Sequence, residues 1–112
     1  MELKAKIWVE HGGGLVFGKG RAELLEAIDQ TGSVSAAARE SGMSYRHAWS
    51  MVRASEERLG RPLLERSRGG SGGGGARLTP LGRNLLEEFR FIEKEFFDHV
   101  RKCEGHMRAL AD

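Results

Sequence analysis

The stretch from Ser33 to Leu59, SVSAAARESGMSYRHAWSMVRASEERL, decides the fold of this chain. Ser33 is a good N-cap for a short helix, VSAAARES, which Gly42 closes. Ser44 caps a longer helix, about YRHAWSMVRASEERL, which ends at Gly60. Two helices joined by a tight glycine-containing turn, the second one longer and arginine-bearing, form a helix-turn-helix arrangement.

One hairpin and one helix are expected before this stretch. Residues 3–10 (LKAKIWVE) alternate apolar and polar side chains, which predicts a strand with one buried face. The glycines at 12–14 allow a chain reversal, so residues 15–17 are expected to return as a short partner strand. From Lys19 the apolar residues fall at helical spacing, and Gly32 predicts the end of that helix.

A second hairpin and a long helix are expected after it. Residues 62–79 carry two short runs with arginines around a glycine-rich tip, which predicts a β-hairpin wing. Thr79 and Pro80 are an N-cap and first-turn pair that opens the last helix. Apolar residues then recur every three or four positions as far as Cys103. This helix is longer and more apolar than one small core requires.

The predicted fold is mainly α with small β-hairpins (α+β). It is a winged helix-turn-helix with a long C-terminal dimerisation helix. At 112 residues the chain has room for one domain with one core. We expect residues 1–79 to form the winged domain with its N-terminal hairpin, residues 80–104 to form the dimerisation helix, and residues 105–112 to form a C-terminal tail.

The positive charge is concentrated in the middle of the chain. The whole chain carries a net charge of +2. Residues 39–83 hold nine arginines, no lysine and four glutamates, a net charge of +5, whereas residues 1–38 carry −1 and residues 84–112 carry −2. The planar arginine fork suits phosphates and guanine edges better than the point charge of lysine. A solvated basic surface is the alternative interpretation of this charge.

The first turns of the longer helix of the motif carry the candidate base-reading residues. Ala48, Val52 and Leu59 lie on a core-facing stripe, which leaves polar side chains on the outer side. Arginine, serine and histidine suit guanine edges, mixed positions and phosphates. A surface helix with incidental polar groups is the alternative. The predicted DNA contacts here are Ser44, Tyr45, Arg46, His47, Ser50 and Arg53.

The wing and the start of the short helix are expected to position the DNA backbone. The glycine tract lacks the Lys-Ser/Thr ending and the strand-to-helix context of a phosphate-binding Walker loop. A wing along the DNA backbone or minor groove fits the flanking arginines, although a flexible low-complexity turn is the plainer interpretation. The predicted backbone contacts are Ser33, Ser35, Arg66, Arg68 and Arg77.

The apolar stripe of the last helix predicts a homodimer. Its second half extends past anything else that so short a chain supplies, and a soluble monomer rarely tolerates a large exposed apolar patch. Pairing with the same helix of a second chain buries one self-complementary patch on both partners. Folding back of the strand at 3–10 is the competing explanation. The predicted dimerisation residues are Leu85, Phe89, Ile92, Phe96 and Val100.

His99, Cys103 and His106 offer one alternative function. They stand at i, i+4 and i+7, so one helix face presents three soft ligands to a metal ion. Stray histidines and a cysteine near a helix end are the more common case, and Gly105 is expected to end the helix before His106. We therefore expect no metal ion, and keep a metal-responsive sensor as an alternative.

Several classes of function are not expected. No Ser/His/Asp or Cys/His set and no paired carboxylates in a pocket are recognisable, so neither an enzyme nor a cofactor is predicted. No apolar run approaches the ~20 residues that span a bilayer, and no signal peptide is recognisable. A single Cys fits a reducing compartment. The expected location is the cytoplasm.

Four segments also resemble a known family. These are GSVSAAA at 32–38, GMSYRHAW at 42–49, LER at 64–66 and GGSGGGGARLT at 69–79. They resemble the N-terminal DNA-binding domain of the ModE family, the prokaryotic molybdate-responsive regulators related to the LysR-type winged helices. The resemblance covers roughly residues 15–100, and the wing motif is its most specific part.

The resemblance implies a dimer joined through the long helix, with the recognition helices in successive major grooves of double-stranded DNA. In the family the oxyanion-binding domains follow the long helix, whereas this sequence stops at Asp112. A stand-alone regulator is therefore expected, and molybdate is not expected as a ligand of this chain. A protein-interaction module that has lost DNA binding is the first alternative function.

Overall fold

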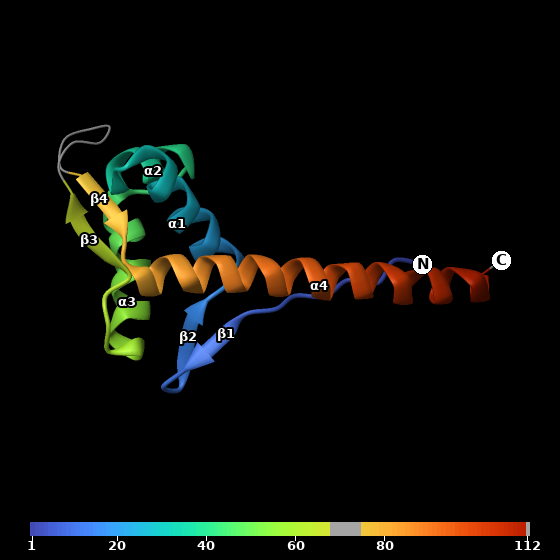
Figure 1. The fold of residues 1–112 in the computed structure, drawn as a ribbon. Helices are drawn as coiled ribbons and strands as arrows, with labels where there is room; N and C mark the ends of the chain where they lie inside the picture. The colour runs from blue at the N-terminus through green and yellow to red at the C-terminus, as the bar shows by residue number, and fades with distance from the viewer. Residues whose placement is uncertain (68–74, 112) are drawn as a thin grey trace.

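In the part of the chain that the structure describes, the fold has four helices and two antiparallel hairpins (Figure 1). The computed structural model describes residues 1–67 and 75–111. The elements in chain order are β1 (Val9–His11), β2 (Gly14–Phe17), α1 (Lys19–Thr31), α2 (Val34–Glu40), α3 (Tyr45–Leu59), β3 (Leu64–Ser67), β4 (Gly75–Leu78) and α4 (Pro80–Ala111). The prediction of a winged helix-turn-helix with a long C-terminal helix is confirmed.

Local capping builds the helix-turn-helix as the sequence predicts. The Ser33 hydroxyl accepts a hydrogen bond from the Ala36 amide at 3.1 Å, and the Ser44 hydroxyl accepts one from the His47 amide at 3.0 Å. Gly42 takes a φ of 69° in the turn between α2 and α3, and Gly60 takes 70° at the end of α3. Glycine adopts these left-handed angles without the steric cost that a Cβ brings.

One core joins α1, α2, α3, both hairpins and the start of α4. Phe17 of β2 and Phe89 of α4 pack edge to face, with ring centroids 5.3 Å apart. Phe17, Leu24 and Ile28 are 0% exposed, and Phe89 is 2% exposed. The three helices of the winged domain therefore pack around an aromatic pair that ties the first hairpin to the first turns of α4.

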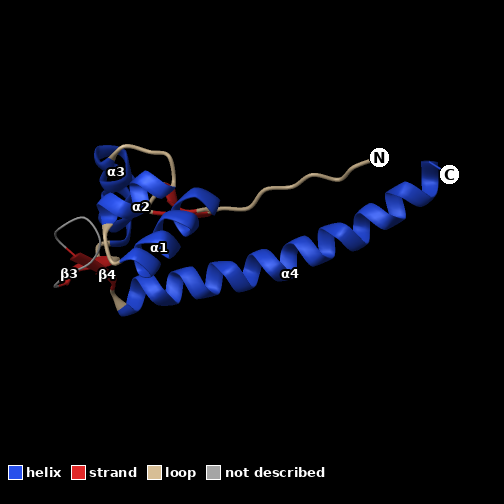
Figure 2. Ribbon diagram, turned by 90° about the horizontal axis from the view of Figure 1, so that it is seen from above, coloured by secondary structure: helices blue, strands red, loops and turns tan. Residues whose placement is uncertain are grey.

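The N-terminal strand is shorter than predicted. Only Val9–His11 pairs with β2, and residues 1–8 form no strand. The reason is that β2 has four residues, and a register shift between Val9 and Glu10 interrupts the ladder, so nothing pairs with residues 3–8. Instead this arm runs out beside α4 (Figure 2), and the Leu3 amide donates to Glu104 Oε2 at 2.9 Å.

The wing is the second hairpin, as predicted. Leu64 pairs with Leu78 and Arg66 with Ala76 in one antiparallel ladder. The Ala76 amide donates to the Gly32 carbonyl oxygen at 2.9 Å, which joins the wing to the end of α1. The glycine tip at 69–74 lies outside the described residues.

The last helix continues beyond the end expected near residue 104. It runs through Gly105 to Ala111, so the predicted C-terminal tail is helical as far as Ala111. A glycine inside a helix costs roughly 1 kcal/mol. The ion pair between Arg108 and Glu104, at 2.8 Å and four residues apart, spans this glycine and helps the helix to continue.

The first turn of α4 is anchored to the winged domain. Thr79 Oγ1 accepts a hydrogen bond from the Gly82 amide at 3.1 Å and donates one to the Pro62 carbonyl oxygen at 2.8 Å. A Cβ on Gly82 would collide with the carbonyl oxygen of Leu63, so the helix approaches the wing closely there. Across residues 1–67 and 75–111, no helix combines the length and the hydropathy that a membrane-spanning segment needs.

Candidate nucleic-acid interface

The outer face of α3, the start of α2 and the wing enclose a groove of about 920 Å³. Three arginines from two elements reach it: Arg46 and Arg53 from α3, and Arg66 from β3. The full lining is Val34, Ser35, Tyr45, Arg46, Trp49, Ser50, Arg53, Glu56, Pro62, Leu64, Glu65, Arg66, Gly75 and Ala76. The structure thus brings together six of the predicted DNA contacts from three separate elements.

The two faces of α3 divide as the sequence predicts. Ala48 and Val52 are buried at 0% and 1% exposure, and Ser55 is buried beside them. The predicted outer residues Tyr45, Arg46, His47, Ser50 and Arg53 are all exposed. His47 lies outside the groove lining, and the Ser44 hydroxyl is occupied by the helix cap.

Tyr45, Trp49 and Arg53 form a row along α3, four residues apart. The rings of Tyr45 and Trp49 meet edge to face at 6.4 Å, and the Arg53 guanidinium lies 5.0 Å from the centroid of the Trp49 ring. Such a cation–π contact restrains a long side chain that is otherwise free to rotate. The half-buried Trp49 ring lines the groove and holds Arg53 in it.

The predicted wing arginines have different surroundings. Arg66 shares the strand face of Leu64 and Ala76 and lines the groove. Arg77 lies on the other face, where its guanidinium pairs with Glu65 at 2.8 Å, and it does not line the groove. Arg68 lies outside the described residues.

The two serines at the start of α2 also differ. Ser33 is 0% exposed, and its hydroxyl is engaged in the cap of α2. This burial leaves the Ser33 side chain no surface to offer to DNA, so Ser33 caps the helix in this fold. Ser35, the second residue of the same helix, is half-buried and lines the groove.

Other arginines of the basic middle segment do not reach the groove. Arg58 donates to the Leu15 carbonyl oxygen at 3.0 Å and braces the first hairpin. Arg83 donates to both carboxylate oxygens of Asp29, at 2.8 and 3.3 Å, and this hydrogen bonding raises the pKa of the guanidinium. The positive charge seen in the sequence is therefore shared between structural bracing and the groove.

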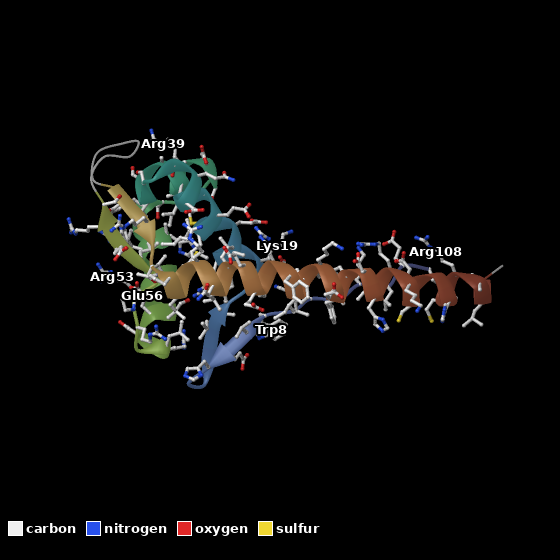
Figure 3. All side chains as sticks on the ribbon, viewed as in Figure 1. Trp8, Lys19, Arg39, Arg53, Glu56 and Arg108 are labelled. Atoms are coloured by element: carbon white, nitrogen blue, oxygen red, sulfur yellow. The ribbon has the colours of Figure 1, made fainter. Side chains whose placement is uncertain are left out.

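Glu56 is a groove residue that sequence reasoning missed. Its Oε2 accepts hydrogen bonds from the backbone amides of Leu63 and Leu64, at 2.8 and 3.3 Å. These bonds tie the last turns of α3 to the start of β3 (Figure 3 shows Glu56 close to Arg53). A glutamate near a helix end is ordinary in sequence, so only the folded chain identifies this contact.

The predicted metal ligands are only partly brought together. Cys103 Sγ lies 3.5 Å from His99 Nε2 on adjacent turns of α4. Among residues 1–67 and 75–111, no group of three or more histidine, cysteine or acidic side chains has the arrangement of a metal site. The helix also continues past Gly105, so the expected break before His106 is absent.

The predicted dimerisation residues fall into two groups. Phe89 is 2% exposed, and Leu85 is half-buried against the core, so both belong to the winged domain of their own chain. Ile92 is 47% exposed, and Phe96 and Val100 are half-buried on the part of α4 beyond that domain. The Phe89 ring therefore fills the core of its own chain against Phe17, unlike the more exposed residues beyond it.

Known proteins resemble this chain over about 80 residues. It is 48% identical over 80 residues to the molybdenum-pterin-binding protein MopB of Rhodobacter capsulatus, covering 71% of this chain and 30% of MopB. It is 37% identical over 81 residues to the DNA-binding transcriptional dual regulator ModE of Escherichia coli K12, covering 70% of this chain and 31% of ModE. The chain thus spans about a third of the length of these curated relatives.

The winged fold also matches a structure solved with DNA. The crystal structure of the CbnR_DBD–DNA complex superimposes with a TM-score of 0.57 and 28% sequence identity, covering 82% of this chain and 95% of that chain. The family model described as bacterial regulatory helix-turn-helix protein, lysR family, matches residues 20–83. This chain belongs to the lysR family of bacterial regulatory helix-turn-helix proteins.

Proposed function

We propose that the chain binds double-stranded DNA sequence-specifically and regulates transcription, acting as a homodimer on a roughly palindromic operator. The observation that carries this proposal is the groove in which Arg46 and Arg53 of α3 face Arg66 of the wing. Helix-turn-helix proteins insert the second helix of the motif into the major groove, where its first turns meet base edges. A groove lined by arginines from helix and wing suits DNA seated between them.

We assign the contacts in two classes. Tyr45, Arg46, His47, Ser50 and Arg53 read base edges or adjacent phosphates, because they occupy the exposed first turns of α3. The second class contacts the phosphates of the DNA backbone and fixes the position of the protein along the duplex. Its members are Ser35, Arg66, Arg68 and Arg77, of which Arg68 rests on the sequence alone.

Ion pairing within the wing supports a weaker role for one of these residues. Arg77 must leave Glu65, 2.8 Å away, or share its guanidinium with that carboxylate when it contacts a phosphate. Arg66 has no such competitor among the described residues. We therefore rank Arg66 above Arg77 as a phosphate contact.

The homodimer rests on α4 beyond the winged domain. The exposed and half-buried apolar residues Ile92, Phe96 and Val100 lie there without cover from the core of their own chain. A two-fold axis through this part of the helix buries one patch on both chains and spaces two recognition helices for two half-sites. A regulator of this kind acts in the cytoplasm, where bacterial DNA lies.

The name of MopB refers to molybdenum, and the proposal does not extend to it. The region shared with MopB and ModE is about a third of their length. The proposed ligand of this region is DNA.

Selection of bound duplexes from a random double-stranded pool, followed by titration of the winning sequence, tests the proposal. We expect a palindromic consensus, two chains per duplex in sedimentation, and an affinity that falls steeply as salt rises, since bound phosphates release counterions. A chain that enriches no sequence and shows no salt dependence would instead support the protein-interaction module. Zinc titration by calorimetry addresses the metal-sensor alternative at His99, Cys103 and His106.

A further inference from the structure

A second cavity, of about 530 Å³, lies between the N-terminal arm, the start of α1 and α3. It shares no lining residue with the DNA groove. Two of its lining residues, Trp8 of the arm and Lys19 of α1, are labelled in Figure 3. The full lining is Lys6, Ile7, Trp8, Leu15, Gly18, Lys19, Gly20, Arg21, Glu23 and Met51.

Positive charge dominates this cavity. Lys6, Lys19 and Arg21 line it against the single carboxylate of Glu23. Within the described part of the chain, none of these three cations forms an ion pair, whereas Arg90 on nearby α4 pairs with both Glu26 and Glu93. Lys6 and Lys19 are exposed, whereas Arg21 is half-buried. A partly buried cation without an ion pair is costly unless a ligand supplies the missing negative charge.

Arg21 is the best placed of the three to hold an anion. Its Nε donates to Ser55 Oγ at 2.8 Å and to the Met51 carbonyl oxygen at 3.2 Å, which fixes the side chain against α3. The two terminal nitrogens form no hydrogen bond within the described residues. Burial and the neighbouring Arg58 lower the pKa of this guanidinium, the direction expected for a cation that has no anionic partner.

The remaining wall of the cavity is apolar. Ile7 and Trp8 of the arm, Leu15 and Met51 supply its apolar surface, and Trp8 is 53% exposed. The indole nitrogen of Trp8 donates to Glu10 Oε2 at 2.8 Å, which holds the ring in place. A ligand that fits must therefore join a negative group to an apolar body.

We propose that this cavity binds a small organic carboxylate. Arg21 takes the carboxylate through its terminal nitrogens, with Lys19 and Lys6 adding charge. Trp8 and Met51 cover the apolar body. Arginine and carboxylate match in planar geometry, so the pair selects carboxylates over neutral polar groups. This site is separate from the proposed DNA contacts. Arg21 nevertheless links it to α3, because its guanidinium also donates a hydrogen bond to Ser55 of that helix.

Titration of the ¹⁵N-labelled full chain with 3-phenylpropionate, followed by NMR, tests the proposal. At constant ionic strength we expect saturable shifts of the Trp8 indole and of the amides of Lys19, Gly20 and Arg21. A probe of this size gives a dissociation constant on the order of 1 mM. The neutral 3-phenylpropanamide is expected to bind at least about 10-fold more weakly, because it lacks the charge that Arg21 recognises.

Two variants and one control locate the site. Arg21→Gln removes the guanidinium that would hold the carboxylate. Lys19→Gln removes one positive charge at an exposed position, away from the core. We expect binding of 3-phenylpropionate to disappear in the first and to weaken several-fold in the second. Arg101→Gln, on distal α4, is expected to bind like the parent. If the Arg21→Gln chain loses its native amide spectrum, the variant has misfolded, and probe binding by Lys19→Gln relative to the parent then decides the question.

Three results would overturn the proposal. These are no shift at Trp8 or Arg21 up to tens of millimolar probe, equal binding of the amide, or shifts confined to Arg46, Arg53 and Arg66. The last would mean non-specific anion binding in the DNA groove. DNA binding is measured on the same preparation without probe. Failure of the carboxylate site is therefore distinguished from failure of the proposed DNA binding.

Discussion

The winged domain and the distal part of α4 carry the same apolar spacing but bury it very differently. Phe89 closes the domain at 2% exposure, whereas Ile92, the next residue of the stripe, is 47% exposed. The helix itself does not change between them, since α4 runs unbroken from Pro80 to Ala111. The difference arises because the winged domain ends beside Phe89 and leaves the next turns of the helix without a partner from their own core.

One amphipathic pattern serves two purposes in this chain: its first part fills the core, and its second part leaves apolar side chains that need another partner. Burying a large apolar side chain contributes about 1.5–3 kcal/mol relative to leaving it exposed. Up to Phe89 the chain obtains this stabilisation from its own core. Beyond it, the same stabilisation is available to Ile92, Phe96 and Val100 only from the N-terminal arm or from a second chain.

The largest change in stability is expected from a substitution in the buried part of the α4 stripe. Phe89→Ala removes the ring that packs on Phe17 and should lower the free energy of unfolding by about 3–5 kcal/mol, at any protein concentration. Phe91→Ala, two residues along the same helix and 60% exposed, is the matched control and should lose much less. Urea denaturation followed by circular dichroism measures both, and equal losses would contradict the division of α4 drawn here.

The second prediction concerns the proposed dimer interface on the distal part of α4. Phe96→Glu places a charge in the proposed interface, so the chain should sediment as a monomer at micromolar concentration while staying helical by circular dichroism. Losing the tethered second half-site should weaken operator binding by on the order of 100-fold or more. Glu95→Gln, exposed beside it, is the control. A parent chain that is already monomeric at these concentrations would rule out the dimer and the symmetric operator.

The third prediction concerns base reading within the winged domain. Arg46→Ala should cost about 1–3 kcal/mol of binding free energy on the specific site and relax the preference at one or two base pairs. Lys102→Ala, exposed on distal α4, should leave the preference unchanged. Titrations against the consensus and its single-base variants supply the measurement. Unchanged specific affinity would mean that α3 does not dock as proposed.

The smallest expected effect belongs to the wing. Arg66→Ala should weaken binding to all sequences about equally and reduce the slope of log affinity against log salt by roughly one. Arg77→Ala should have a smaller effect, because its ion pair with Glu65 already competes for the guanidinium. Fluorescence anisotropy at several salt concentrations compares the two. A loss confined to one operator sequence would show that the wing reads bases.

Much of the fold was predictable because its signals are local. Ser33, Ser44, Gly42 and Gly60 mark helix ends through contacts within four residues of themselves, and each lies where the pattern predicted. The exposed face of α3 follows from helical periodicity alone. The end of α4 was missed because a glycine usually predicts a helix end, whereas α4 continues through Gly105 to Ala111.

The N-terminal arm shows where such signals fail. Alternation at residues 3–10 predicts a strand, but a strand needs a partner of matching length, and β2 offers only four residues. Periodicity describes one segment and carries no information about the length of its neighbour. The same limit explains why Phe89 was grouped with Ile92: both lie on one stripe, and only the packing of Phe17 separates them.

By itself the sequence determined the helix-turn-helix, the wing, the long helix and the outer face of α3, because each depends on neighbours along the chain. The tertiary structure alone decided which polar groups are available for DNA. It buries Ser33, pairs Arg77 with Glu65 and Arg83 with Asp29, and stacks Arg53 on Trp49. Burial and ion pairing depend on distances between residues far apart in the chain, and those distances exist only once the core has formed.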